Sequence, residues 1–341
     1  MKLKMLSLAL ALALPAAAFA QDGAAKAQEV LKQARAAVGK EDKIKAMQNL
    51  VAEGNGRRMA GQRTIEGGIT VQIVSPDKIR KEQSITTPQG DIVQIDVLNG
   101  AKVWNDVDSP FPQGGPGGGG MRGMFGGGGG GGFLDQAAQE RNRRNDLTRV
   151  MLGWLLTAPS GVSVQYAYAG QVKAPDGRTA DMIDVKDEAG LVARLYFDQE
   201  SHQLLMLAYK DKDMRQVFGQ RGPQGGGQAG PGGQGQPGGQ PRQREDLSKL
   251  SPEEREKRQA EIREQQQKRQ AEMKAAYEKA PLVDVIWNFS DYKSVNGLNL
   301  PHRLTKSTGG QATEEWEISK FKLNQNVKAD KFEKKEKKPT T

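Results

Sequence analysis

Residues 91–107 read DIVQIDVLNGAKVWNDV, and this stretch decides the fold. Between 93 and 97 apolar residues alternate with polar ones, the pattern of a strand with one buried face. Asn99 and Gly100 follow directly, and this dipeptide is a strong signal for a tight hairpin turn. A partner strand then runs through Trp104. The sequence therefore predicts a β-hairpin here.

The same alternation extends in both directions along the chain. The preceding segment, ITVQIVSPDKIRKEQSI at 69–85, carries two strands separated by a turn or bulge at Pro76 and Asp77. Short turns such as 188–190 and 296–297 separate the later strands. These are expected at 162–172, 180–186, 191–198, 204–210, 283–292, 298–307 and 313–323. Strands in hairpin succession, without intervening helices, predict an antiparallel meander.

Two segments carry helical periodicity beside these strands. Residues 23–38 place apolar side chains at three- and four-residue spacing. Residues 146–157, DLTRVMLGWLLT, have a wide apolar face, with Asp146 as a plausible N-cap and Pro159 as a plausible stop. We expect this second helix to lie across the sheet. A shorter helical or loop stretch is expected at 44–50, after which the period changes to two and the chain is expected to form strands.

The N-terminus has the features of a cleavable export signal. Lys2 and Lys4 precede an apolar run, and Ala18 and Ala20 form an A-x-A cleavage site that would leave Gln21 first. The run at 5–14 is shorter than the roughly 20 residues that a membrane-spanning helix needs. We therefore expect a signal peptide at 1–20, no transmembrane segment after cleavage, and a periplasmic or secreted protein.

Residues 21–341 are expected to form a single domain with three interruptions. A glycine-rich insertion at 113–132 and a Gly/Gln/Pro-rich insertion at 219–244 are predicted to be disordered. A charged helix is predicted at 251–280, where Ser251, Pro252 and Glu254 match an N-cap, a first-turn proline and a capping box. Its few apolar residues predict a mostly solvated helix.

The sequence offers little that could perform catalysis, so we expect no enzyme, no cofactor and no metal. It has no cysteine, and its two histidines, His202 and His302, are far apart and outside any metal-binding motif. Asp211 and Asp213 lack the glycine turn and closing glutamate of a calcium loop. The formal charge of +9 falls to +7 without the signal, so the mature chain is mildly basic. Its arginines are not interleaved with the aromatic residues on which bases stack, so nucleic acid is not an expected partner.

The predicted fold class is mainly β with helices, as a half-open antiparallel β-barrel or curved sheet wrapped around helices. If the sheet is incompletely closed, its concave face is an apolar groove with a helical lid, suited to acyl chains at about 0.8 kcal/mol per buried CH₂. The alternative is that the helix fills the sheet and the interior is a packed core.

Several stretches resemble the LolA and LolB superfamily of periplasmic lipoprotein carriers. VQIVSPDKIRKE at 71–82, followed by NGAKVW at 99–104, is similar to its strand–proline–strand–hairpin pattern. LYFDQESHQLLML at 195–207 is similar to its central hairpin, and 291–307 with 314–335 to its C-terminal strands, which end on a phenylalanine that matches Phe332. The resemblance covers most of the chain outside the three interruptions.

This resemblance implies a half-open barrel that carries the acyl chains of a lipoprotein or a free lipid between the inner and outer membranes. The groove would be lined by Val71, Ile73, Val93, Ile95, Trp104, Ile183, Leu195 and Phe197, and the lid formed by Leu147, Met151, Trp154 and Leu155. In the carriers an arginine before the strand-ending proline holds the lid closed, but here that position is Ser75. Arg80 matches a common basic position of the family or is an ordinary solvent-facing residue.

The alternative function is an envelope interaction or scaffold protein with a filled core. Its glycine-rich segments, charged helix and basic tail KKEKKP at 334–339 would then bind a membrane protein or an anionic surface.

Overall fold

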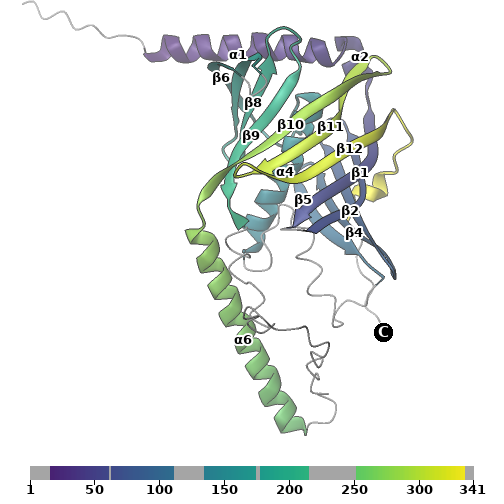
Figure 1. Ribbon diagram of the computed structural model, residues 1–341, viewed down its shortest axis with the longest axis vertical. Coiled ribbons are helices and arrows are strands. Elements are labelled where there is room, and N and C mark those ends of the chain that lie inside the picture. The colour runs from purple at the N-terminus through teal and green to yellow at the C-terminus, as the bar shows by residue number, and fades with distance from the viewer. Residues whose placement is uncertain (1–15, 61–62, 111–133, 174–176, 215–250, 335–341) are drawn as a thin grey trace, which may run out of the picture.

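The computed structural model describes residues 16–60, 63–110, 134–173, 177–214 and 251–334 (Figure 1). Its main feature is one antiparallel sheet of 12 strands. The strands are β1 (Asn49–Ala60), β2 (Arg63–Val74), β3 (Lys78–Thr87), β4 (Gly90–Asn99), β5 (Lys102–Asp108), β6 (Gln165–Lys173), β7 (Thr179–Lys186), β8 (Val192–Asp198), β9 (Leu204–Lys212), β10 (Leu282–Val295), β11 (Leu298–Thr308) and β12 (Gln311–Leu323).

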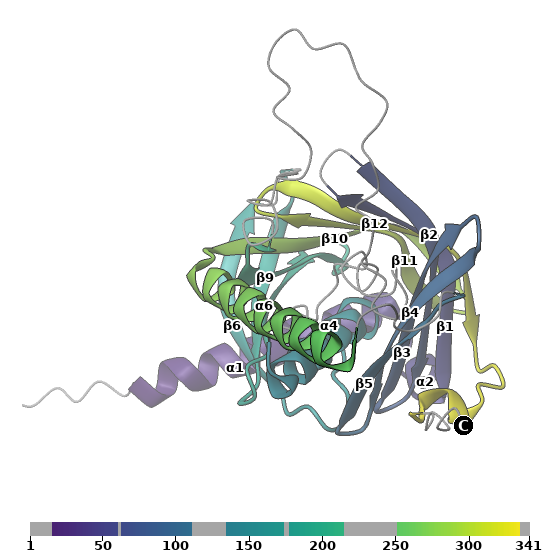
Figure 2. The ribbon, with the colours of Figure 1, turned by 90° about the horizontal axis from the view of Figure 1, so that it is seen from below.

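The sheet consists of two meanders joined at one seam. Its strand order is β5-β4-β3-β2-β1-β12-β11-β10-β9-β8-β7-β6, so among the described strands only β1 and β12 pair without being consecutive in the chain. The sheet curls on itself, and its two edge strands, β5 and β6, do not pair with each other (Figure 2). The predicted half-open, curved antiparallel sheet is confirmed.

Sequence periodicity indicated strands from Leu50 onward but did not give bounds for the seam strand β1, which begins at Asn49. Gly54, Gly56 and the Arg57-Arg58 pair interrupt the apolar alternation that marks a strand. Gly54 is needed because β12 lies very close, and a Cβ there would overlap the carbonyl oxygen of Glu317; a Cβ on Gly56 would make only ordinary contacts. The close contact at Gly54 thus explains one of the interruptions in the alternation.

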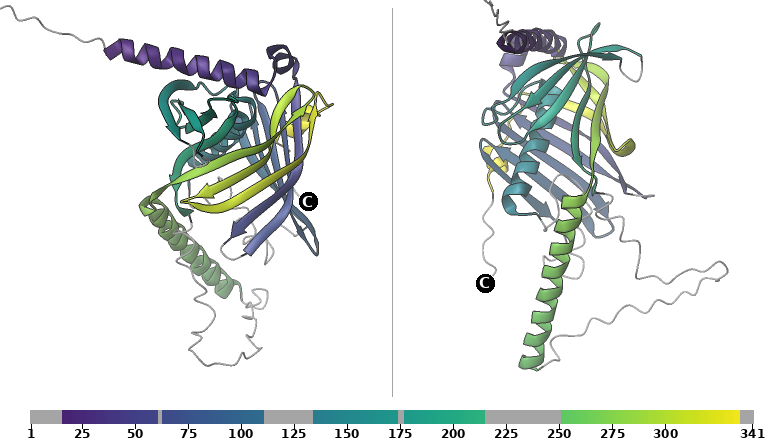
Figure 3. Two further views of the ribbon diagram at one scale, coloured as in Figure 1. Left: turned by 45° about the horizontal axis from the view of Figure 1, so that its top comes forward. Right: turned by 90° about the vertical axis from the view of Figure 1, so that its left-hand side faces the viewer.

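Helices lie at both ends of the sheet and inside it (Figures 1 and 3). Helix α1 (Ala16–Val38) crosses one end and packs against β6 and β11, and the short α2 (Glu41–Ala46) follows it. Helix α6 (Pro252–Lys279) extends away from the opposite end. Its predicted capping box is present, with Ser251 and Glu254 bonded reciprocally, and it has no buried residue. The prediction of a solvated helix is confirmed.

Helix α4 (Gln136–Leu155) lies on the concave side of the sheet, in the opening between β5 and β6 (Figure 2). It begins ten residues before the predicted start at Asp146, because Asp135 is the true N-cap and accepts a hydrogen bond from the Ala138 amide at 2.7 Å. Its first half, residues 136–145, is polar apart from Ala137 and Ala138, so apolar periodicity alone marked only its second half. The helix ends at Leu156 in a left-handed C-cap, three residues before Pro159.

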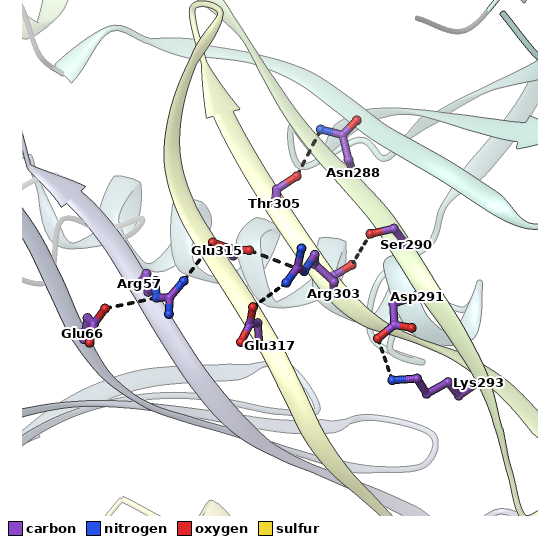
Figure 4. Close-up of polar contacts among 10 residues, drawn as sticks. All are labelled: Arg57, Glu66, Asn288, Ser290, Asp291, Lys293, Arg303, Thr305, Glu315 and Glu317. Atoms are coloured by element: carbon purple, nitrogen blue, oxygen red, sulfur yellow. Dashed lines mark hydrogen bonds and ion pairs between the residues drawn. The ribbon is translucent and has the colours of Figure 1, made fainter. Parts of the chain in front are cut away.

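The convex face of the seam carries a row of ion pairs (Figure 4). Arg57 on β1 binds Glu66 on β2 at 3.1 Å and reaches Glu315 on β12 at 3.8 Å. Arg303 on β11 then binds Glu315 at 3.6 Å and Glu317 at 2.6 Å. The charges alternate across four neighbouring strands, as expected of a solvated face with compensated charge.

The C-terminal 3-10 helix η2 (Ala329–Phe332) packs on the outside of β3 and β4. Phe332 is only 1% exposed, and its carbonyl oxygen accepts a hydrogen bond from Trp104 Nε1 at 3.2 Å. Arg80 Nη1 donates to the Lys331 carbonyl at 2.9 Å, so Arg80 ties down this segment from the convex face.

Several predictions concern residues that the structure does not describe. They are the two insertions at 113–132 and 219–244, most of the predicted signal, and the basic tail beyond Lys334. Within the described ranges, no helix has the length and hydropathy needed to cross a membrane.

We predict that Phe332→Ala lowers the free energy of unfolding by about 3–5 kcal/mol, as for other fully buried phenylalanines. Chemical denaturation monitored by circular dichroism measures this change. The neighbouring exposed Lys331→Ala serves as the control and should change stability by less than about 0.5 kcal/mol. Equal effects of the two substitutions would show that η2 is not anchored by Phe332.

Candidate ligand-binding interior

Five of the eight predicted groove residues face the interior. Val71, Ile73, Ile183, Leu195 and Phe197 belong to the main hydrophobic cluster, and each is at most 1% exposed. The cluster also includes residues from α1, α4, β1, β9, β10, β11 and β12. The interior is therefore lined by both meanders.

The other three, Val93, Ile95 and Trp104, lie on the convex face, and this assignment was wrong. On β4 the inward positions are Ile92, Gln94, Asp96 and Leu98, which alternate with half-buried Val93 and Ile95. Trp104 is opposite Val97 and bonds to η2 outside the sheet. On β4 the polar residues Gln94 and Asp96 face inward, whereas Val93, Ile95 and Val97 face outward. The more hydrophobic face of this strand is therefore not the face that lies against the core. A one-residue change of register reverses the two faces.

The four predicted lid residues lie on α4 and are buried against the concave face. Leu147, Met151, Trp154 and Leu155 all belong to the main cluster. The Trp154 ring packs against Trp316 and Phe321 of β12, with centroids 6.3 and 5.8 Å away. On the same helix a Cβ at Gly153 would lie 2.7 Å from the ring of Phe289 on β10, so the helix and the strand are in direct contact.

Polar bonds fasten α4 to both meanders. Toward the first meander, buried Arg143 binds Asp96 of β4 at 3.1 Å. Toward the second, Arg144 binds Asp187, in the β7–β8 turn, at 3.0 Å, and Arg149 donates to the Val192 carbonyl at 3.2 Å. Helix α4 is therefore a bridge across the opening of the sheet. Its own arginines hold it in place. Ser75, the position for which the sequence resemblance implied an arginine, is exposed at the β2–β3 turn.

Although these bonds hold α4 in place, several of its buried polar side-chain atoms have no hydrogen-bond partner. Thr148 Oγ1 and Trp154 Nε1 are buried without a hydrogen-bond partner, and so are the Nε atoms of Arg144 and Arg149. Within the described residues, α4 contributes half of all such side-chain atoms. Because each unmade buried hydrogen bond costs about 1–3 kcal/mol, the seated position of α4 is less stable than its apolar packing alone would make it.

Beside α4, toward the end of the sheet from which α6 extends, lies a polar cavity that we call the basic chamber. Its walls combine apolar residues of the main cluster, such as Phe289, Leu304 and Trp316, with charged side chains. The charged residues are Arg58, Lys81, Asp146, Arg149, Lys306 and Glu314. About 40 Å³ is available to the centres of water-sized molecules, against about 10 Å³ in a second cavity between α1 and α4. Both cavities are thus far smaller than the roughly 300–1,000 Å³ of pockets for drug-sized ligands.

Glu314 is the central acid of the basic chamber. Its Oε1 accepts hydrogen bonds from Trp316 Nε1 at 2.7 Å and Gln83 Nε2 at 2.8 Å, and lies 3.6 Å from Arg58 Nε. Burial alone would raise the pKa of this carboxyl, but Arg58, Lys306 and Lys81 outweigh burial and lower it to about 2. Glu314 is therefore ionised at neutral pH.

The histidines have structural surroundings. His302 Nδ1 lies 2.7 Å from the Ile318 carbonyl, and its ring packs edge-on against Phe321. His202 occupies a left-handed turn position between β8 and β9. Among the described residues, no three metal-ligating side chains come together.

Comparisons with known proteins give likenesses of fold only. No family model matches the chain, and no curated protein matches its sequence. A domain named as an outer membrane lipoprotein-sorting protein, from Vibrio parahaemolyticus, is similar with a TM-score of 0.45 and 9% identity, over 91% of this chain and 97% of that one. A DUF1329 family protein from Desulfovibrio piger has a TM-score of 0.41 and 10% identity, over 90% and 97%. A LolA superfamily protein from Nitrosomonas europaea has a TM-score of 0.38 and 9% identity, over 90% and 97%.

We predict that Glu314 makes the stability of the protein pH-dependent. Its folded-state pKa of about 2 lies below the ordinary value of 4.5, so its contribution is complete above about pH 4.5 and is lost as the pH falls toward 2. The difference in unfolding free energy between wild type and Glu314→Gln should therefore shrink by on the order of 3 kcal/mol between pH 5 and pH 2. Urea denaturation across this range measures it. A difference for Glu314→Gln that does not vary with pH would contradict the prediction.

Proposed function

We propose that this protein is a periplasmic lipid-binding or lipoprotein-carrier-like protein that holds acyl chains beneath α4, between the inner and outer membranes. The observation that supports it best is the combination of apolar packing and unpaired buried polar atoms on α4. It covers an apolar concave face in the opening of the sheet, yet it leaves four buried polar atoms without partners. An element with this balance of contacts suits a lid that is displaced when ligand enters. The proposed role needs no catalytic group.

The energies of lid and ligand are of similar size. Moving α4 away would expose five large buried side chains (Leu147, Met151, Leu152, Trp154 and Leu155), at roughly 1.5–3 kcal/mol each, or about 8–15 kcal/mol together. An acyl chain of ~14 methylenes, taken from water into the same space, contributes roughly 11 kcal/mol. One chain about offsets the lid, and two or three clearly exceed it. The proposed ligand is therefore a lipid or lipoprotein with several chains.

A second candidate is the envelope interaction protein with a filled core. It is favoured by α6, whose 28 residues include none that is buried, and by the small volume of both cavities. In this role α4 would stay seated, and α6 would provide the binding surface. The two functions differ in whether the interior opens.

We predict that delipidated protein binds a triacylated peptide saturably, at about one per chain, and binds the same peptide with a single acyl chain at least about 100-fold more weakly. The reason is that a single chain only offsets the cost of displacing α4. Native mass spectrometry gives the stoichiometry, and tryptophan fluorescence gives the affinity, since Trp154 and Trp316 lie at the lid contact. Failure of both peptides to bind would favour the interaction protein.

We further predict that locking α4 to the sheet abolishes this binding. The wild-type chain has no cysteine, so Arg144→Cys with Asp187→Cys gives one reactive pair where an ion pair of 3.0 Å now joins α4 to the β7–β8 turn. A short reducible bismaleimide should block uptake of the triacylated peptide, and reduction of the linker should restore it. The double variant without linker is the control for the loss of the ion pair. Unchanged uptake by the cross-linked protein would show that α4 is not the lid.

A further inference from the structure

The basic chamber differs from the rest of the interior in having an excess of positive charge. Four cations and two carboxylates line it, so the excess is two. Asp211, on β9, interacts electrostatically with Lys306 and lowers the excess to one when it is included. Burial and the nearby charge of Asp146 raise the pKa of Asp211.

The carboxylates of the chamber already have partners. Asp146 binds Arg149 at 3.1 Å, and Glu314 is taken by Trp316, Gln83 and Arg58. Lys81 lies 3.5 Å from Asp96 on the neighbouring strand β4, which also receives Arg143. Asp146, Glu314 and Asp96 therefore each have at least one cation within 4.0 Å.

Lys306 is the exception among the four cations. Its Nζ lies over the Trp287 ring, 5.4 Å from the centroid, and within the described part of the chain it has no carboxylate within 4.0 Å and no hydrogen bond. Burial would lower the pKa of Lys306, but Tyr209, Glu314 and Asp146 together raise it above its ordinary value. A charged ammonium group thus faces the chamber with three donors available.

The apolar wall of the chamber is continuous with the interior that α4 covers. Leu207, Tyr209, Phe289, Leu304 and Trp316 line the chamber and also belong to the main hydrophobic cluster. Val150 and Arg149 bring α4 into the same wall. A ligand whose chains replaced α4 would therefore present its polar end to the cations.

We propose that the basic chamber is the headgroup site for a phosphorylated lipid, with Lys306 and Arg58 binding the phosphate while the acyl chains lie beneath α4. This inference rests on the proposed function, because it takes the interior as the chain-binding site. A phosphate oxygen would meet an ammonium group and a guanidinium group beside an apolar wall, where charge-assisted hydrogen bonds are strong. A neutral headgroup would leave the charge of Lys306 uncompensated in a partly buried site.

The test compares two lipids with identical chains. Delipidated protein is incubated with equal small amounts of dipalmitoyl phosphatidic acid and dipalmitoylglycerol, dispersed together in micelles of a non-ionic detergent without phosphate, and the lipids on the re-isolated protein are measured by mass spectrometry. We expect the protein to hold phosphatidic acid in at least about tenfold excess, which corresponds to about 1.4 kcal/mol. Equal uptake of the two lipids would overturn the headgroup site and leave the proposed function intact. Uptake of neither would overturn both.

Lys306→Met tests the site itself. It removes the charge and keeps an unbranched apolar side chain, so the preference for phosphatidic acid should fall at least about threefold while uptake of dipalmitoylglycerol is kept. Lys320→Met, on the exposed outer side of β12, removes the same charge from the surface and should leave the preference unchanged. Equal effects of the two variants would assign the preference to general surface charge. The wild-type comparison remains decisive if Lys306→Met does not fold.

Inorganic phosphate, titrated into lipid-free protein by calorimetry, separates a lipid headgroup from a free ion. We expect no saturable binding, because free phosphate has no acyl chains to displace α4 and hold the phosphate group in the chamber. Saturable binding that Lys306→Met abolishes would assign the chamber to a free anion and would overturn the lipid headgroup.

Discussion

The pairing of β1 with β12 is the constraint on which the rest of the structure depends. Within each meander consecutive strands pair with each other, whereas this seam pairs the first strand of the chain with the last and so joins the two meanders into one sheet. Its register places Arg57 opposite Glu315 on the convex face and Arg58 opposite Glu314 on the concave one. The same two pairs of neighbours thus contribute to the solvated row of ion pairs outside and to the basic chamber inside. The glycine at position 54 permits the close approach that this register requires.

Because the sheet curls without closing, something must cover the apolar surface between β5 and β6. Helix α4 does so, and it is held by arginines that reach a carboxylate in each meander. Its apolar packing stabilises the seated position, whereas its unpaired buried polar atoms oppose it. Since an acyl chain can contribute about as much burial as α4, the covered interior suits exchange between helix and lipid.

The interior is divided along the axis of the sheet. Near α1 it is apolar and tightly packed, with about 10 Å³ of space, while near the attachment of α6 it is lined by charged residues. An amphiphile has the same division into chains and headgroup. The basic chamber complements an anionic headgroup, and this complementarity extends the proposed function from acyl chains alone to a class of lipid.

The sequence by itself determined the local elements: the hairpin at Asn99-Gly100, the strands of the second meander, the capped helix α6 and the absence of cysteine. Periodicity and turn residues are local properties, so they were sufficient for these predictions. Only the tertiary structure decided that β1 pairs with β12, that Val93, Ile95 and Trp104 face outward, and that the chamber gathers side chains from α4 and several strands. Alternation shows that a strand has two faces but not which of them is covered, since η2, arriving from the C-terminus, buries Val97 on the convex side. Ion clusters across the seam depend on contacts between residues more than 200 positions apart, as in the bond from Gln83 to Glu314, and local pattern does not encode them.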